Sequence, residues 1–176
     1  MILLFLVFVT TFASCEPKQK TNTSEIKTDD YLILFFSEED GTHRYEDIKG
    51  NIVIPPDKYE MIFTDTFKTM AIVLTKNDWK FLGIDRNENI LFEIFSVDNG
   101  PDYVEDGLFR IIKDGKIGYA DLDGNIIIEP QFKCAFAFDN GFAEVSNDCW
   151  EEQTGEYTLW KSNNWITIDT IGNVVE

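Results

Sequence analysis

Histidine is nearly absent from this chain: His43 is the only one among 176 residues. A Ser-His-Asp triad or a histidine-rich metal centre needs imidazole groups at defined positions. His43 aligns with a large apolar position of an internal repeat, so we expect it to be a partly buried structural residue and not a general base. No catalytic residue, metal ligand or cofactor is therefore predicted. A carboxylate pair of the glycosidase kind stays open, because acidic residues are numerous.

Basic residues are scarce as well. The chain has 15 Lys and Arg against 32 Asp and Glu, which gives a net charge of −17. Basic side chains supply most of the affinity of proteins for nucleic acid and anionic lipid, so we expect no nucleic-acid partner and no direct electrostatic attachment to a membrane. Strong acidity usually serves solubility, and we favour that interpretation over an acidic docking patch.

The chain also lacks an apolar run of about 20 residues, the length that spans a bilayer as a helix. Its most apolar segment, residues 1–14, carries no charged side chain and ends at Cys15. Such a segment predicts a signal peptide, and Phe12-Ala13-Ser14-Cys15 resembles the lipobox of bacterial lipoproteins. In those proteins a signal peptidase cleaves before a cysteine that carries a diacylglycerol. The resemblance implies lipid attachment at Cys15, and the alternatives are an ordinary signal peptide or a misassigned start codon.

The segment after this cysteine, residues 15–30, has Ile26 as its only large apolar residue. It predicts a flexible tether with a mean span of roughly 20 Å. The folded body is then residues 31–176, and a composition of 44% hydrophobic residues supports a single folded domain. We expect the protein at the bacterial cell envelope, at the outer membrane or cell surface more than in the cytoplasm, and in contact with the membrane only through its lipid.

A short motif recurs four times in the body, with an Asp, an Asn four residues later and then a β-branched residue. The four motifs are Asp47–Ile52, Asp85–Ile90, Asp121–Ile126 and Asp169–Val174. A second landmark, an apolar segment that starts 20 to 22 residues after the Asp, follows the first three motifs. Two landmarks that stay in phase indicate an internal repeat of about 36 residues.

Each motif has the composition of a tight hairpin turn, which is clearest in the third. Lys116–Asp121 predicts a strand, Asp123 and Gly124 are expected to take the positive φ angles of the turn, and the chain returns from Asn125. The aspartate can accept backbone N–H groups of the turn, and glycine tolerates left-handed geometry. The structural turn positions are therefore Asp47, Asp85, Asp121, Asp169, Gly50, Gly124 and Gly172.

The returning strand of the third motif is expected to stop at Glu129-Pro130, because proline removes a hydrogen-bond donor. Residues 142–145 are expected to add a third strand. We predict an all-β fold, an array of about four antiparallel three-stranded meanders. Each meander is too small to bury its own apolar face, so stacking on its neighbours must supply the core.

The third copy resembles a WG repeat. Residues 116–121, 124–128, 130–132 and 141–145 are similar to the family pattern Lys-Trp-Gly-Tyr-Ile-Asp, Gly-Lys-Ile-Val-Ile, Pro-Pro-Tyr and Gly-Leu-Ala. Across the four copies, only Trp165 keeps the signature Trp and only Gly118 the signature Gly. The resemblance implies an interaction module without a common catalytic site. It places repeats at residues 43–78, 79–115, 116–146 and 165–176, with an insertion at 146–164.

The insertion predicts an elongated hairpin around the turn Gln153–Glu156. Its aromatic residues Trp150, Tyr157 and Trp160 form a candidate binding surface, because insertions in repeat arrays often carry binding and aromatics can dock a protein or stack on a sugar. We favour the alternative that Trp150 and Trp160 pack the hairpin onto the sheet.

Two cysteines remain in the body, Cys134 and Cys149. In an exported protein they can form a disulfide, which adds about 3 kcal/mol for a loop of this length. We favour two buried free thiols, because a disulfide needs Cα atoms within about 7 Å of each other.

Calcium is a further candidate, because Asp121, Asp123 and Asn125 alternate as oxygen ligands do in an EF-hand loop. Their glycine comes one position early, and the glutamate at the twelfth position is missing. We therefore interpret this segment as a hairpin turn and predict no metal.

The sequence thus favours non-enzymatic binding at the cell envelope, with a protein or a glycan as the partner. Two alternatives stay open. The charge of −17 would suit an acidic partner that neutralises a basic toxin. The many acidic residues leave room for an envelope hydrolase that uses an unrecognised carboxylate pair.

Overall fold

The computed structural model describes residues 30–175. These residues form eighteen β-strands, and no helix is present among them. The all-β prediction is therefore confirmed. In the described part of the chain, no helix has the length and apolarity needed to cross a membrane. Residues 1–29, with the predicted signal peptide, Cys15 and most of the predicted tether, lie outside the described residues.

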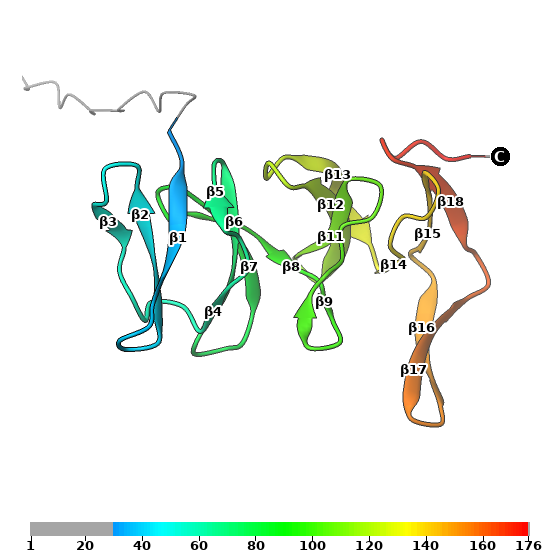
Figure 1. Cartoon of the computed structure of the whole chain (residues 1–176). Helices are drawn as coiled ribbons and strands as arrows, with labels where there is room; N and C mark the ends of the chain where they lie inside the picture. Colours follow the sequence, from blue (N-terminus) through cyan, green and yellow to red (C-terminus); the bar gives the residue numbers. More distant parts are fainter. Residues whose placement is uncertain (1–29, 176) are drawn as a thin grey trace, which may run out of the picture.

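Four antiparallel units follow one another along the body (Figure 1). Unit 1 contains β1 (Leu32–Ser37), β2 (Thr42–Asp47) and β3 (Ile52–Ile54). Unit 2 contains β6 (Met70–Leu74), β7 (Phe81–Asp85) and β8 (Ile90–Ile94). Unit 3 contains β11 (Leu108–Lys113), β12 (Lys116–Asp121) and β13 (Ile126–Phe132). Unit 4 contains β15 (Phe142–Ser146) and β18 (Ile166–Asp169), and a bridge between Ile168 and Val174 takes the place of its third strand.

Short strands connect these units. They are β4 (Met61–Ile62), β5 (Thr66–Phe67), β9 (Ser96–Val97), β10 (Gly100–Pro101) and β14 (Cys134–Ala135). The insertion forms β16 (Cys149–Thr154) and β17 (Tyr157–Ser162). Units 2 and 3 share one sheet of order β13-β12-β11-β8-β7-β6-β4, whereas unit 1 lies in the sheet β3-β2-β1-β5 and unit 4 in β14-β15-β18.

The grouping of strands differs from the expectation that residues 142–145 belong with the third motif. These residues lie in β15, which pairs with β14 and β18, while β11 supplies the third strand of unit 3. The reason is local: Asp114 and Gly115 both have positive φ and form a two-residue turn that joins β11 directly to β12. Each unit therefore begins with the strand that precedes the one ending at the motif aspartate, as β11 precedes β12 in unit 3.

The register is the same in all four units, since the first residue of the first strand always faces the motif aspartate. The four pairs are Leu32 with Asp47, Met70 with Asp85, Leu108 with Asp121, and Phe142 with Asp169. The repeat seen in the sequence is thus a repeat of hydrogen-bonded structure, including the copies in which the WG pattern is weakest.

The four Asp motifs form the same turn. In the third, one carboxylate oxygen of Asp121 accepts the N–H groups of Asp123 and Asn125 at 3.0 and 2.9 Å, and the other accepts the amide of Asn125 at 2.9 Å. Equivalent bonds are made by Asp47, Asp85 and Asp169. Both oxygens of each motif carboxylate therefore accept hydrogen bonds within the turn, which gives these aspartates a structural role.

The prediction of positive φ angles at both Asp123 and Gly124 was wrong for Asp123. Only Gly124 has a positive φ, of 88°. The turn is therefore of the three-residue kind that ends in a left-handed residue. Gly50 and Gly172 have the same role at φ values of 82° and 88°, and Glu88 occupies the position in unit 2 at 62°. Glu88 keeps this rarely adopted conformation while its carboxylate accepts a hydrogen bond from Tyr59 at 3.1 Å.

Acid should weaken the fold through these turns. Hydrogen bonds from Asn51 lower the pKa of Asp47, and at Asp121 the hydrogen bonds led by Asn125 outweigh burial, so its pKa is also lowered. A lowered pKa means that the ionised turn stabilises the fold fully above the unfolded value of about 3.9, and that this stabilisation is lost as the pH falls below it. We expect urea midpoints to be steady from about pH 7 to 5 and to drop below about pH 4.

Replacing all four turn aspartates by asparagine should flatten this drop, whereas Glu39→Gln, at an exposed residue of the β1–β2 turn that belongs to none of the four Asp motifs, should leave it unchanged. An equally steep acid transition in the fourfold variant would assign it to other carboxylates. The measurement is urea unfolding across this pH range.

Stacking of the units supplies the core, as expected, because three apolar clusters each lie at a junction between neighbouring units. The cluster between units 1 and 2 contains Leu32, Tyr45, Ile54, Phe67, Ala71, Val73 and Ile84. The next contains Met70, Ile72, Leu74, Phe81, Phe92, Ile94, Phe109, Ile111 and Ala120. The last contains Leu108, Ile117, Tyr119, Ile128, Ala135, Phe138, Ala143, Val145 and Ile168. Strand β6 is buried along its whole length because alternate residues face opposite junctions.

One cross-strand pair explains why unit 2 departs from the repeat pattern. Units 1 and 3 pair a tyrosine with an isoleucine, Tyr45 with Ile54 and Tyr119 with Ile128. In unit 2 the corresponding pair is Gly83 with Phe92, and a Cβ on Gly83 would lie 2.6 Å from the Phe92 ring. The large side chain has moved to the other strand, so the volume at the junction is kept.

The outer face of unit 1 carries charge where inner units carry apolar residues. At the positions of Leu82 and Ile84 in unit 2, unit 1 has Arg44 and Glu46. These two form an ion pair at 2.7 Å, and the Arg44 guanidinium lies 4.1 Å from the centre of the Phe35 ring. A polar outer face of this kind suits contact with water.

Candidate functional site

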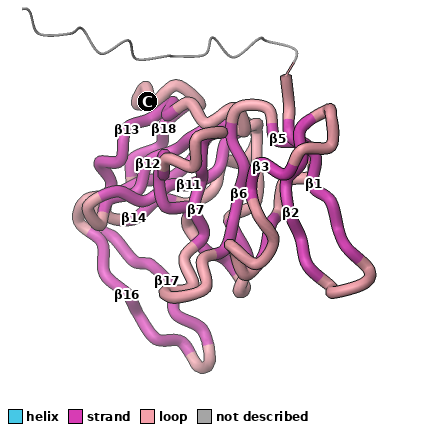
Figure 2. Tube along the Cα trace, turned by 90° about the vertical axis from the view of Figure 1, so that its left-hand side faces the viewer, coloured by secondary structure: helices cyan, strands magenta, loops and turns pink. Residues whose placement is uncertain are grey.

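The insertion between β15 and β18 forms the predicted elongated hairpin, β16 paired with β17 from Cys149–Ser162 at its base to Thr154–Tyr157 at its turn. Gly155 has a φ of 64°, which fits the first central position of a two-residue turn. The hairpin projects beyond the sheets in both views (Figures 1 and 2). It belongs to a separate two-stranded sheet, so the body holds it mainly by its base and one face.

The three aromatic residues proposed from the sequence have different surroundings. Trp160 is turned toward the body, where its ring centre lies 5.7 Å from that of Phe95 and 5.8 Å from that of Phe136. Trp150 is 45% exposed and Tyr157 is 75% exposed. The packing interpretation therefore describes Trp160, while Trp150 and Tyr157 are accessible to a partner.

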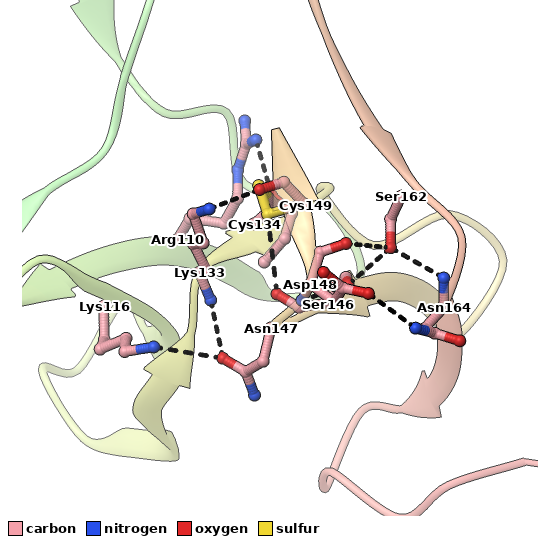
Figure 3. The surroundings of a disulfide bond; sticks show 11 residues. Arg110, Lys116, Lys133, Cys134, Ser146, Asn147, Asp148, Cys149, Ser162 and Asn164 are labelled. Atoms are coloured by element: carbon pink, nitrogen blue, oxygen red, sulfur yellow. Dashed lines mark hydrogen bonds between the residues drawn. A yellow bond between two sulfur atoms is a disulfide. The ribbon is translucent and has the colours of Figure 1, made fainter. Parts of the chain in front are cut away.

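A disulfide joins Cys134 of β14 to Cys149 at the base of the hairpin (Figure 3). The preference for two free thiols was wrong, because antiparallel pairing of β14 with β15 and the short turn into β16 bring the two Cα atoms to 6.3 Å. The Lys133 ammonium also donates a hydrogen bond to the carbonyl of Cys149 at 2.5 Å. These links fix the hairpin base to the segment formed by Lys133 and β14, which follows directly after β13.

Reduction of this disulfide should lower the free energy of unfolding by about 3 kcal/mol, the value expected for a loop of fifteen residues. Urea unfolding with and without reductant measures the difference, and a Cys134→Ser, Cys149→Ser double variant should match the reduced protein and no longer respond to reductant. Alkylation of both cysteines in denaturant without reductant would contradict the bond.

A groove follows the hairpin where it meets the body. It consists of two cavities, the first of about 490 Å³ and the second of about 560 Å³, within the range of ligand sites. The first is lined by Phe95, Ser96, Val97, Arg110, Phe136, Glu151, Thr158, Leu159, Trp160 and Lys161. The second is lined by Phe95, Ile112, Gly115, Ile117, Lys133, Cys134, Cys149, Trp150, Glu151 and Trp160. We call the two together the hairpin groove.

A buried ion pair lies beneath the first cavity. Arg110 and Asp102 are 8% and 5% exposed, and two N–H groups of the guanidinium reach the two carboxylate oxygens at 2.9 and 2.5 Å. Arg110 also donates to the carbonyl of Ala135 at 3.2 Å, and its guanidinium carbon lies 4.3 Å from the centre of the Phe95 ring. The pair therefore fixes both the connection to β14 and one wall of the groove.

Sequence reasoning missed Phe95, Asp102, Arg110 and Phe136, although one signal was present. Arg110 is a charged residue within an apolar strand, at the position that Ile72 occupies in unit 2. Its partner Asp102 lies in a connection between strands and has no pattern of its own. The groove arises only when the hairpin returns to the body.

The wall of the hairpin groove is aromatic, and Arg110 is paired beneath it. Among residues 30–175, no group of three or more His, Cys, Asp or Glu side chains is placed to hold a metal ion. His43 lies elsewhere, in unit 1, with its ring centre 4.9 Å from that of Phe36. The expectation of a partly buried His43 was wrong, because the residue lies near the turn of the β1–β2 hairpin and its side chain is exposed.

Comparison with known families finds one match: the model of the family "WG containing repeat" matches residues 117–148. The matched segment runs from β12 to the residue before β16, so it covers β12 and β13 of unit 3 together with β14 and β15. This is the third sequence copy, which resembles the repeat most closely. No curated protein and no solved structure matches the chain. The family match is compatible with a binding or interaction module.

Proposed function

We propose that this chain is a non-enzymatic binding module held at the bacterial cell envelope by a lipid on Cys15, with the hairpin groove as its docking surface. The observation that carries the proposal is the position of the groove, which lies between the body and the hairpin that interrupts the repeat. Insertions in repeat arrays commonly carry binding. The repeat units supply a rigid base, and the hairpin presents aromatic residues from it.

Photocrosslinking tests the docking surface. A photoreactive phenylalanine analogue at Trp150 or Tyr157 should crosslink to one defined envelope species in living cells, because both side chains are accessible beside the groove. Trp79 offers a matched control, since it is a tryptophan with 64% exposure in the connection between β6 and β7. The same adducts from Trp79, or no adducts from the hairpin positions, would remove the groove from the proposal.

Fractionation tests the anchor. Replacing Cys15 by serine should move the protein from the detergent phase to the soluble phase, because stable membrane attachment through lipid requires the acyl chains that this cysteine would carry. Cys134→Ser is the matched control, since it removes a body cysteine and should leave the partitioning unchanged. Unchanged partitioning of the Cys15→Ser protein would rule out the anchor.

A second candidate is favoured by charge. The hairpin carries Glu151 and Glu152 on β16 and Glu156 in its turn, against Lys161 alone on β17, within a chain of net charge −17. Such a surface fits a basic partner, including a toxin that the chain would neutralise. Binding that weakens steeply with added salt would support it, and salt-independent binding would count against it.

A further inference from the structure

The first cavity of the hairpin groove has strand edges as two of its walls. On one side the lining residues are Phe95, which precedes β9, and Ser96 and Val97 of β9. On another side they are the consecutive residues Thr158–Lys161 of β17. Because side chains of a strand alternate between its faces, a run of consecutive lining residues means that the backbone edge itself faces the cavity.

On the β17 side, the hydrogen-bonding pattern of the hairpin decides which backbone groups face outward. A two-residue turn makes Thr154 and Tyr157 a hydrogen-bonded pair. Hydrogen-bonded and non-hydrogen-bonded pairs alternate along an antiparallel ladder, so Thr158 and Trp160 lie in non-hydrogen-bonded pairs. Their N–H and C=O groups point away from β16. The sheet has only these two strands, so within residues 30–175 no strand pairs with this edge.

The β9 side follows the same logic. Asp98 and Asn99 both have positive φ and form a two-residue turn, so Val97 and Gly100 are the hydrogen-bonded pair and Ser96 faces outward. The N–H and C=O of Phe95 are already used, by the carbonyl of Arg110 and the N–H of Asp102. The backbone of Ser96 is therefore the group that β9 offers to the cavity.

We propose that an extended segment of a partner protein enters the first cavity and adds a strand between β9 and β17. This inference rests on the proposed function and names its partner class. Main-chain hydrogen bonds to an open sheet edge supply affinity, and pockets for alternate side chains supply specificity. Here alternate apolar side chains of the segment would rest on Phe95, Phe136 and Trp160.

The charge of the segment follows from the surroundings of the cavity. Within the first cavity Glu151 and Lys161 balance each other, and Arg110 is paired with Asp102. Outside it, Glu152 and Glu156 of the hairpin and a chain charge of −17 favour a segment with net positive charge. A glycan fits less well. The unpaired groups on two walls are backbone amides and carbonyls, which match a peptide backbone better than sugar hydroxyls.

Selection from a random library of linear peptides displayed on phage, against the purified chain, tests the inference. Enriched peptides should carry apolar residues at alternate positions and net positive charge. Synthetic peptides of the enriched sequences, N-methylated at alternate residues, should bind at least about tenfold more weakly, because methylation removes the donors that pair with the strand edges. Lack of enrichment, or full affinity of the methylated peptides in both registers, would overturn the proposal.

Variants of the chain provide the second arm. Thr158→Pro removes an outward N–H that hairpin pairing does not use, whereas Thr158→Val keeps that N–H and the shape of the side chain. The proline variant should lose peptide binding, and the valine variant should keep it. Equal binding by both would overturn the strand-addition geometry. Binding of glycans but not of peptides on arrays would also overturn it, while hairpin crosslinks to a glycan-bearing species would leave the proposed function standing.

Discussion

Gly118→Ala is expected to destabilise the folded chain by about 3 kcal/mol, the upper end of the range for overpacked sites. A Cβ on Gly118 would lie 2.4 Å from the carbonyl oxygen of Ile128, 2.5 Å from the nitrogen of Pro130 and 2.8 Å from the carbonyl carbon of Glu129. All three are backbone atoms, so no flexible side chain can move aside. Urea unfolding followed by tryptophan fluorescence measures the loss.

The matched control is Gly100→Ala. Its Cβ would meet only the carbonyl oxygen of Val97, at 3.5 Å, which is ordinary contact, and its φ lies outside the left-handed region. This variant should stay within about 0.5 kcal/mol of the parent. If the two substitutions had equal effects, the close approach of β13 to Gly118 would be wrong.

Gly118 also explains why the repeat pattern is degenerate. Strand β13 continues through Pro130 to Phe132, contrary to the expectation that it ends at Glu129-Pro130. Between the pairs Tyr119–Ile128 and Ile117–Phe132 the register shifts, so the extra backbone of β13 bulges over Gly118. Only glycine leaves room for this bulge.

Unit 2 shows what happens without the bulge. Leu82 occupies the equivalent position and pairs with Glu93 in continuous register beside Gly83 and Phe92. A side chain is then tolerated. Loss of the glycine in other units is thus tied to the path of the returning strand, and it leaves the sheet intact.

The turns were predictable from the sequence because their bonds are local. Each joins an aspartate to groups two and four residues later, as with Asp121, Asp123 and Asn125, so a short pattern contains all the interacting groups. The strands of the third copy were predictable for the same reason, because the alternation of apolar and polar residues and the turn residues that bound a strand lie within a few positions of each other.

The candidate site could not be read in this way. Its central contact joins Phe95 to Trp160, which lie far apart in the chain and meet only after the units stack and the hairpin returns. The disulfide was undecided in the sequence because it depends on a distance between Cα atoms, which pairing of β14 with β15 sets. Local sequence patterns were therefore enough to predict the repeat, whereas the hairpin groove depends on contacts between distant segments.

The second large effect is expected from Asp102→Asn, with a loss of about 3–5 kcal/mol. The substitution leaves the Arg110 charge buried without its counter-ion, and the same carboxylate also accepts the Arg110 backbone N–H at 2.8 Å. Glu46→Gln is the control, because it breaks an ion pair with the more exposed Arg44 and should change stability by less than about 1 kcal/mol. Urea unfolding of both variants gives the comparison.

A double variant separates the role of the ion pair in stability from its role in the groove. Arg110→Met with Asp102→Leu removes both charges, and a long apolar side chain at position 110 resembles Ile72, its counterpart in unit 2. Part of the stability lost in Asp102→Asn should return, because an apolar pair needs no counter-ion. The recovery should be incomplete, because leucine cannot accept the backbone N–H of residue 110 that Asp102 accepts. The contact of Arg110 with Phe95 would be gone, however, so the groove wall would lose its support. Recovered stability with weakened crosslinking at Trp150 would mean that the pair shapes the docking surface, whereas recovery of both would restrict it to a packing role.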